Sequence, residues 1–273
     1  MDLDADADGD EEGDGSTTDV PRTVTAALAD RPVEGRVCLE AGAGIGNTSA
    51  GLLAAGADRV YAVTNDRGHA ETVRDRVGPA AAGDARANAA GGRAADDRLA
   101  VVEADLRSVP LDADAVGLVT AHGLFNVVPP ASLDRIAAEL TRVAAPGAHL
   151  VVDDYDPLPD DAAVRDLFAV ENAATELATG SPALTFYPAA VLARLFAGYG
   201  WTVDRERTLL DPVPWTGRHV SAHAAKARGA ASSLRPELGD PLAAEADRLA
   251  AAVGEESAGR MYSVALRLPE EHG

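Results

Sequence analysis

Short runs of apolar residues alternate with amphipathic stretches along most of this chain. Runs rich in Val, Leu and Ala that end in Gly or polar residues are typical of buried parallel strands. They predict strands at 36–40, 59–64, 99–103, 115–120, 149–153, 201–209 and 261–268. Apolar residues three and four positions apart predict helices at 23–30, 47–55, 69–77, 132–144, 160–179, 188–197 and over most of 218–253.

Strands that alternate with helices imply an α/β fold with a doubly wound, mostly parallel sheet of seven strands. Residues 1–19 alternate Asp with Ala or Gly, which predicts a disordered acidic tail. The remainder, 20–273, is expected to form a single domain with a helical insert at about 216–255. The stretch 78–97 is rich in Ala, Gly and Arg and is expected to be a low-complexity loop or a frayed helix end.

The net charge of the chain argues against some classes of binding partner. The 273 residues carry 24 Lys and Arg against 44 Asp and Glu, a net charge of −20. Nine of these acids lie within residues 2–19, so the rest of the chain has 35 acids against 24 bases, a net of −11. This balance argues against binding to nucleic acid or to anionic lipid, because both need clustered positive charge. Abundant acids, with Lys226 as the only lysine, resemble the composition of proteins from salt-adapted organisms; an acidic protein from a GC-rich genome is the alternative.

The cysteine count and the lack of long apolar segments indicate where in the cell the protein is expected. Cys38 is the only cysteine, which excludes an internal disulfide and a cysteine-based zinc site. The sequence has no run of 18 apolar residues, and its acidic start does not resemble a secretory signal. A cytoplasmic protein with no membrane partner is therefore expected.

The most informative segment is the glycine-rich turn Glu40-Ala-Gly-Ala-Gly-Ile-Gly46, which follows a predicted strand and opens a helix. Glycines allow a tight turn and the close approach of a ligand to the backbone. Dinucleotide-binding folds place their third Gly three residues after the second, but here Asn47 occupies that position. No Gly-Lys-Ser/Thr follows, so a phosphate-binding P-loop is excluded.

This turn resembles the first motif of class I S-adenosylmethionine-dependent methyltransferases, acid-x-Gly-x-Gly-x-Gly, and matches it in full. The resemblance covers about 20–210 and 261–268, and implies a Rossmann-like methyltransferase fold with an antiparallel last strand. It also implies S-adenosyl-L-methionine as cofactor, with Glu40 near its methionine amino group. The turn residues implied to lie against the cofactor are Gly42, Ala43, Gly44 and Gly46.

Two further positions follow from the same resemblance. Family members end their second strand in an acid that holds the ribose, but this chain has Thr64 there, followed by Asn65 and Asp66. Asn65 is the residue we expect to supply the hydrogen bond. After the third strand, Asp105 is expected to accept the adenine amino group, with the Leu106 backbone beside the ring.

Candidate catalytic residues follow the fourth and fifth strands, because ligands in this fold bind beyond the carboxyl ends of the strands. His122 is a candidate general base or cofactor contact, or else a turn residue that bonds only the backbone. Asp153 and Tyr155 are candidates at the end of the fifth strand, whereas Asp154 and Asp156 are expected to be solvated.

Three residues near the insert are expected to be structural. His219 and His223 share a helix face, but a zinc site needs a third ligand, so we expect surface residues and no metal. Trp215 could cap the substrate cleft or anchor a helix to the core, and the anchor is the role we expect.

The leading hypothesis is a methyltransferase with a small-molecule acceptor. The Asn/Asp-Pro-Pro-aromatic motif of enzymes that methylate nucleic-acid amino groups is absent after the fourth strand. The alternatives are an NAD-type oxidoreductase on a related fold and a non-catalytic S-adenosylmethionine-binding regulator. The sequence identifies neither the acceptor nor the oligomeric state.

Overall fold

The computed structural model describes residues 20–83 and 98–270. Its centre is a seven-stranded sheet with the strand order β3-β2-β1-β4-β5-β9-β6. The strands are β1 (Val37–Ala41), β2 (Arg59–Thr64), β3 (Leu99–Glu103), β4 (Val116–His122), β5 (Ala144–Tyr155), β6 (Thr202–Leu210) and β9 (Met261–Arg267). Pairings from β3 to β5 are parallel, and β9 runs antiparallel to both β5 and β6. The predicted fold class, with its antiparallel last strand, is confirmed.

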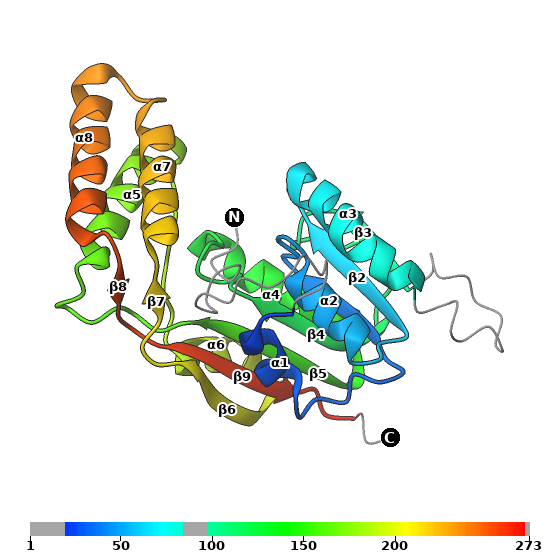
Figure 1. The fold of residues 1–273 in the computed structure, drawn as a ribbon. Helices are drawn as coiled ribbons and strands as arrows, with labels where there is room; N and C mark the ends of the chain where they lie inside the picture. Colours follow the sequence, from blue (N-terminus) through cyan, green and yellow to red (C-terminus); the bar gives the residue numbers. More distant parts are fainter. Residues whose placement is uncertain (1–19, 84–97, 271–273) are drawn as a thin grey trace.

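Helices cover both faces of the sheet (Figure 1). On one face, α1 (Arg22–Leu28), α2 (Asn47–Ala54) and α3 (Arg67–Gly83) enclose a core that includes Val24, Leu52 and Val73. On the other face, α4 (Leu133–Val143) and α6 (Ala189–Ala197) bury Leu140, Phe196 and their neighbours. Almost all of this core is aliphatic, as the scarcity of aromatic residues in the sequence requires.

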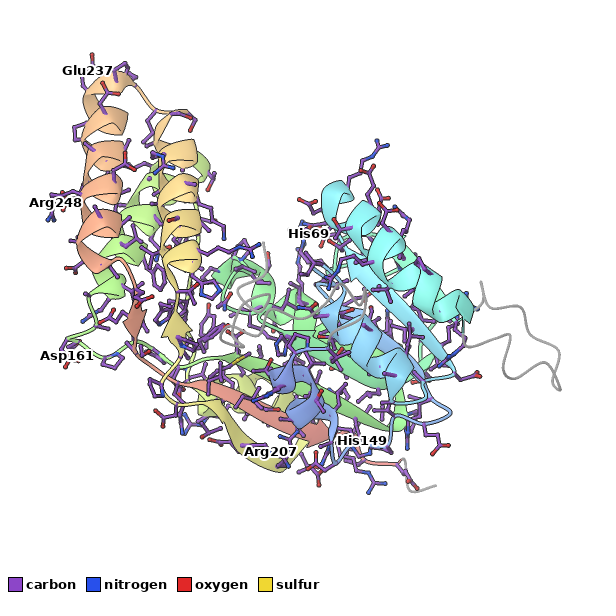
Figure 2. All side chains as sticks on the ribbon, viewed as in Figure 1. His69, His149, Asp161, Arg207, Glu237 and Arg248 are labelled. Atoms are coloured by element: carbon purple, nitrogen blue, oxygen red, sulfur yellow. The ribbon has the colours of Figure 1, made fainter. Side chains whose placement is uncertain are left out.

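Three helices form a separate protrusion beyond the carboxyl end of β5 (Figure 1). They are α5 (Val164–Thr179), α7 (Gly217–Ala231) and α8 (Pro236–Val253), packed around a small core that contains Leu167, Val220 and Ala246. A short ribbon of β7 (Pro214–Trp215) and β8 (Glu256–Ser257) connects α7 and α8 to the sheet. Figure 2 shows Glu237 and Arg248 on α8, and both residues are exposed.

Most predicted elements are present, but some bounds differ. β2 and β3 have the predicted bounds, whereas β5 begins five residues earlier than expected, at Ala144. The register between β4 and β5 shifts between Val116 and Leu118, and this irregularity lets the strand continue through Pro146 and Gly147. α3 continues to Gly83, past its predicted end at 77 and through Pro79. The predicted tail at 1–19 and most of the predicted loop at 78–97 lie outside the described residues.

Within residues 20–83 and 98–270, no helix is both long and apolar enough to cross a membrane.

Candidate functional site

The glycine turn after β1 has a backbone that only glycine adopts readily. Gly42, Gly44 and Gly46 have φ of 78°, 49° and 88°, in the left-handed region where a side chain is strained. A Cβ at Gly42 would also lie 2.8 Å from Leu124 Cδ1. The turn therefore needs glycine both for its backbone conformation and for close packing.

The turn is fixed to its neighbours on both sides. The Gly42 and Ala43 N–H groups both donate to the Val63 carbonyl of β2, at 3.0 and 2.9 Å. Glu40 is 3% exposed and accepts a hydrogen bond from Ser49 Oγ, in the first turn of α2. This bond connects the end of β1 to the helix that follows, so Glu40 holds the turn in place.

A cavity of about 260 Å³ opens at the carboxyl edge of the sheet, beside this turn. The ends of three adjacent strands contribute Gly42, Thr64, Asn65, Asp105 and Leu106 to its lining. The apolar wall includes Leu124, Val127, Val128 and Ile136, from the loop after β4 and from α4. Four predicted cofactor residues, Gly42, Asn65, Asp105 and Leu106, are thus brought together, as expected for the carboxyl ends of parallel strands.

Two other predicted turn residues contribute mainly to packing. Ala43 is 2% exposed within the core on the α2 side of the sheet. A Cβ at Gly46 would lie 2.8 Å from Val77 Cγ2 of α3, so glycine here allows α3 to pack closely against the turn.

The end of β2 is organised by its own side chains. Thr64 is 4% exposed, and its Oγ1 accepts a hydrogen bond from the Asp66 N–H at 3.1 Å. Asp66 in turn accepts from the His69 N–H at 2.9 Å, in the first turn of α3, and this bond lowers the pKa of Asp66. Asp66 therefore caps a helix, which leaves Thr64 and Asn65 as the members of this segment in the cavity lining.

Asp105 lies in the loop after β3 and forms an ion pair with a residue that the sequence did not single out. Arg107 Nη2 lies 2.5 Å from Asp105 Oδ2, and Arg107 also lines the cavity. The side-chain and backbone hydrogen bonds from Arg107 lower the pKa of Asp105 to about 2. Asp105 is therefore an ionised acceptor at any physiological pH.

The predicted catalytic residues His122 and Asp153 are paired. They are opposite each other in the register of β4 and β5, and His122 Nδ1 lies 2.8 Å from Asp153 Oδ2. Both are buried, at 8% and 3% exposure. A carboxylate that accepts the Nδ1 proton fixes the ring in the tautomer in which Nε2 carries the lone pair.

Tyr155, the third predicted catalytic residue, lies apart from that pair in an aromatic cluster. Its ring is 5.6 Å from that of Trp215 and 6.4 Å from that of Phe186. Trp215 is 1% exposed and donates from Nε1 to the Ala258 carbonyl at 2.9 Å. The predicted anchoring role of Trp215 is confirmed.

The expectation that Asp154 and Asp156 are solvated was wrong. Asp154 is 1% exposed and accepts from the Asn126 and Tyr155 N–H groups, at 3.1 and 2.8 Å. The Asp156 side chain is 18% exposed, and Arg260 Nη2 lies 2.5 Å from its Oδ2. In both cases specific donors compensate the loss of water.

The expectation that His219 and His223 lie on the surface was also wrong. His219 is 6% exposed and forms a capping box with Thr216 at the start of α7. His223 is 1% exposed; its Nδ1 lies 2.5 Å from Glu171 Oε2 of α5, and its ring lies 4.5 Å from that of Phe168. Within the described ranges, no three His, Cys, Asp or Glu side chains are grouped to hold a metal ion.

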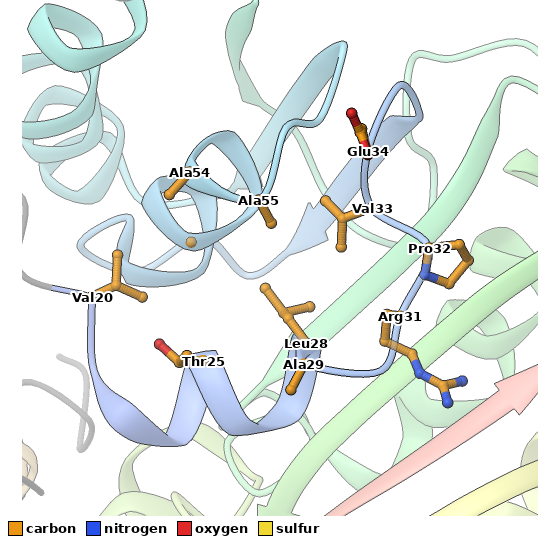
Figure 3. A pocket seen from close by; sticks show the side chains of 11 residues that line it. Val20, Thr25, Leu28, Ala29, Arg31, Pro32, Val33, Glu34, Ala54 and Ala55 are labelled. Carbon is orange, nitrogen blue, oxygen red and sulfur yellow. The ribbon is translucent and has the colours of Figure 1, made fainter.

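A second cavity, of about 720 Å³, lies between α1, the segment before β1 and the C-terminal half of α2 (Figure 3). Its lining is mainly aliphatic, and its charged members are Arg31 and Glu34. Since Arg31 is paired with Asp30 and Asp204, this cavity lacks the convergent polar groups of the first one.

Comparison with known proteins agrees with this geometry. Residues 39–152 match the family model described as a methyltransferase domain. The demethylmenaquinone methyltransferase of Clavibacter sepedonicus is 36% identical over 138 residues, which are 50% of this chain and 48% of that protein. The chain thus spans about half the length of this curated relative. The residues that match the family model include the glycine turn and the residues that line the cavity.

Solved structures share the fold at low sequence identity. The YcgJ protein of Bacillus subtilis has a TM-score of 0.55 at 12% identity, over 92% of this chain and 99% of that one. A geranyl diphosphate C-methyltransferase of Streptomyces coelicolor A3(2) has a TM-score of 0.55 at 15% identity, over 90% of this chain and 74% of that one. The [4+2]-cyclase SpnF has a TM-score of 0.56 at 16% identity, over 91% of this chain and 81% of that one. These likenesses show the fold alone, and a cyclase among them means that the site must indicate the reaction.

Proposed function

We propose that this protein is an S-adenosyl-L-methionine-dependent methyltransferase that acts on a small-molecule acceptor. The observation that carries the proposal is the cavity in which Gly42, Asn65 and Asp105 converge from the ends of three adjacent strands. The match of residues 39–152 to a methyltransferase domain supports it. An NAD-type oxidoreductase is less well supported, because Asn47 stands where the dinucleotide pattern needs glycine.

The cavity suits the proposed cofactor. A Cβ at Gly42 would alter its wall, since it would collide with Leu124, another lining residue. Asp105 supplies an ionised acceptor for the adenine amino group, and the Asn65 amide takes the place of the acid that holds the ribose in resembling proteins. When bound, this cofactor supplies an electrophilic methyl group on a sulfonium; the protein's task is to align the acceptor with it and exclude water.

His122 and Asp153 define the proton chemistry of the proposal. Asp153 orients the His122 ring, and a neutral imidazole with its lone pair on Nε2 takes a proton from an acceptor. Such a base is useful when the nucleophile is a hydroxyl or an activated carbon that must lose a proton. A relative named for demethylmenaquinone and neighbours named for geranyl diphosphate support a small-molecule acceptor of this kind.

The test is to measure binding and transfer separately. Isothermal titration should detect S-adenosylmethionine and S-adenosylhomocysteine but no preference for a nicotinamide dinucleotide. Labelled methyl groups should then pass from the cofactor to a compound in a small-molecule extract. Binding without transfer would favour the non-catalytic regulator, and a folded protein that binds NAD instead would contradict the proposal.

We also propose that the surface is adapted to high salt, on the evidence of a net charge of −11 outside residues 1–19. All binding measurements are therefore best made in molar KCl as well as in dilute buffer.

A further inference from the structure

The His122–Asp153 pair belongs to a row of polar side chains on one face of the sheet. His122, Asp153 and Ser263 are successive partners in the register of β4, β5 and β9, so their side chains lie on the same face. His122 Nδ1 is bonded to one carboxylate oxygen of Asp153, Oδ2. The other oxygen, Oδ1, is buried without a hydrogen bond from any residue that the structure describes. One oxygen of a buried carboxylate therefore has no direct donor.

Ser263 connects this row to a buried arginine of β6. Arg205 Nη1 donates to Ser263 Oγ at 3.2 Å, and Arg205 Nη2 donates to the Ala27 carbonyl of α1 at 2.9 Å. Because α1 covers this face of the sheet (Figure 1), the Arg205 side chain is only 11% exposed. An arginine keeps its charge in proteins. A permanent and largely buried positive charge is therefore bonded to the residue that lies opposite Asp153.

The charges around Arg205 do not balance by themselves. Three arginines and two acids form ion pairs there: Arg31, Arg205 and Arg207 with Asp30 and Asp204. One positive charge is in excess, and the two acids are 37% and 43% exposed, so water screens both of them. Burial lowers the pKa of Arg205, and the negative charges of Asp30 and Asp153 oppose that effect. Asp153 thus supplies the third, and buried, negative charge.

We propose that Arg205 is a positioning residue that balances the buried charge of Asp153, so that His122 stays neutral and can act as a base. A buried carboxylate needs a compensating cation. With His122 as its only partner, Asp153 would favour the protonated imidazole, which has no lone pair to accept a proton. With Arg205 as the cation, the ring keeps its lone pair on Nε2. The catalytic meaning of this inference rests on the proposed function, but the charge balance does not.

Other ionisable side chains lie around His122 and contribute to its charge state. Glu40, at the end of β1 on the same face, is bonded to α2, and its negative charge favours a protonated ring. On β5, Tyr155 lies on the same face as the pair, and Asp154 is buried on the opposite face. α1 has one charged residue, Arg22, which is exposed. None of these groups is altered in the variants below, so a change in His122 reports on the arginines.

The first experiment is an NMR titration of the full-length protein, labelled with ¹⁵N in the imidazoles of its six histidines. Nitrogen chemical shifts distinguish the two neutral tautomers from the imidazolium, and a spectrum of His122→Gln assigns the signal. At pH 7, His122 of the wild type should be neutral, with its proton on Nδ1. A protonated His122 at this pH would overturn the inference without the need for another variant.

Two substitutions should then shift two different histidines. Arg205→Gln should raise the pH midpoint of the His122 titration by about one unit and leave His149 unchanged. Arg31 is the matched control, because its side chain is 6% exposed, it also pairs with Asp30, and its Nη1 lies 3.5 Å from His149 Nδ1. Burial lowers the pKa of His149, and the charge of Arg31 lowers it further. Arg31→Gln should therefore raise the midpoint of His149 and leave that of His122 unchanged.

Arg205→Lys separates charge from packing, because it keeps the charge but not the planar fork. It should leave the midpoint of His122 close to that of the wild type. A rise as large as in Arg205→Gln would assign the effect to packing and overturn the inference. An unchanged His122 in folded Arg205→Gln, or equal shifts of His122 in the Arg205 and Arg31 variants, would also overturn it. If Arg205→Gln does not fold, Arg205→Met, which keeps the aliphatic contacts, should give the same rise.

Binding of S-adenosylhomocysteine, measured by calorimetry on the same samples, tests the proposed function separately. A folded wild type that does not bind this ligand would contradict the proposed function. The titration of His122 needs neither cofactor nor acceptor, so its result on the charge balance would stand in either case.

Discussion

At the scale of single residues, the candidate site depends on positions where one added carbon atom would change the shape of the cavity. Gly42 is the sharpest case, because its φ is 78° and an added Cβ would lie only 2.8 Å from Leu124 Cδ1. Gly42→Ala should lower the affinity for S-adenosylhomocysteine by about tenfold, since strain of about 1–2 kcal/mol and a shifted Leu124 both act on the cavity. Isothermal titration checks this.

Gly35→Ala is the control for Gly42→Ala. Gly35 also has a positive φ, of 69°, but an added Cβ would meet nothing within 4 Å. This variant should lose stability through backbone strain and keep its ligand affinity. If both variants bind the ligand as the wild type does, the glycine turn does not border the cofactor.

The role of His122 is also a question about a single side chain. A substitution there tests whether it affects kcat or the affinity for the cofactor. His122→Gln should lower kcat by about 10²-fold to 10⁴-fold, the usual contribution of a general base. It should leave the dissociation constant of S-adenosylhomocysteine unchanged. Asp153→Asn, which removes the carboxylate that orients the ring, should lower kcat in the same direction and alter its pH profile. A loss of cofactor affinity with kcat intact would instead make His122 a cofactor contact.

The resemblance to a family motif pointed to Gly42, Asn65 and Asp105, and the structure places all three in the lining of one cavity. Each comes within two residues of the end of a predicted parallel strand, and such ends meet at one edge of a sheet. Arg107 was missed, because its role depends on a side chain that turns back within a loop. The burial of His223 was missed for another reason. Its partner Glu171 is 52 positions away, and no local pattern announces a contact between two distant helices.

At the scale of elements, the extent of the protrusion was missed in part, because it too depends on contacts between distant segments. The sequence predicted helices over most of its length, but it assigned only the part after Thr216 to an insert. The structure shows that α5 packs against both α7 and α8, so the unit draws on two separate stretches of the chain. The sheet was easier to predict, since its buried strands are continuous apolar runs and right-handed crossovers limit the possible topologies.

The protrusion depends on a buried pair between two of its helices. Glu171 and the His223 ring are each 1% exposed, so removal of one partner leaves the other buried and uncompensated. Glu171→Ala should lower the free energy of unfolding by about 3–5 kcal/mol, whereas replacement of both residues by Leu should recover most of the loss. Urea denaturation measures both effects. Glu176→Ala, at an exposed position of the same helix, should have almost no effect, because Ala is a better helix former than Glu; an equal loss there would show that the cost does not come from the buried pair.

At the scale of the whole molecule, charge is the dominant feature. The chain has 44 acids against 24 bases, so local ion pairs leave many of the acids without a basic partner. One group of pairs joins the turn after α1 to β6: Asp30 lies 3.2 Å from Arg205 and 3.3 Å from Arg207, and Arg31 lies 2.5 Å from Asp204. Figure 2 shows Arg207 beside the sheet, away from the protrusion. Salt weakens such pairs and also weakens the general repulsion among the acids, so the two effects oppose each other.

We expect the relief of repulsion to be the larger effect, so the melting temperature should rise when KCl is increased from 0.1 M to the molar range. The Debye length falls from about 10 Å to about 3 Å over this range, which screens acids that are too far apart to have a basic partner. Each kcal/mol of relieved repulsion should raise the melting temperature by about 2–4 °C in a protein of this size. Differential scanning calorimetry in KCl and in potassium sulfate of equal ionic strength separates screening from ion exclusion, because screening does not depend on the anion. A melting temperature that stays constant or falls in KCl would show that the relief of repulsion does not exceed the weakening of the ion pairs, and the proposed adaptation to salt would be wrong.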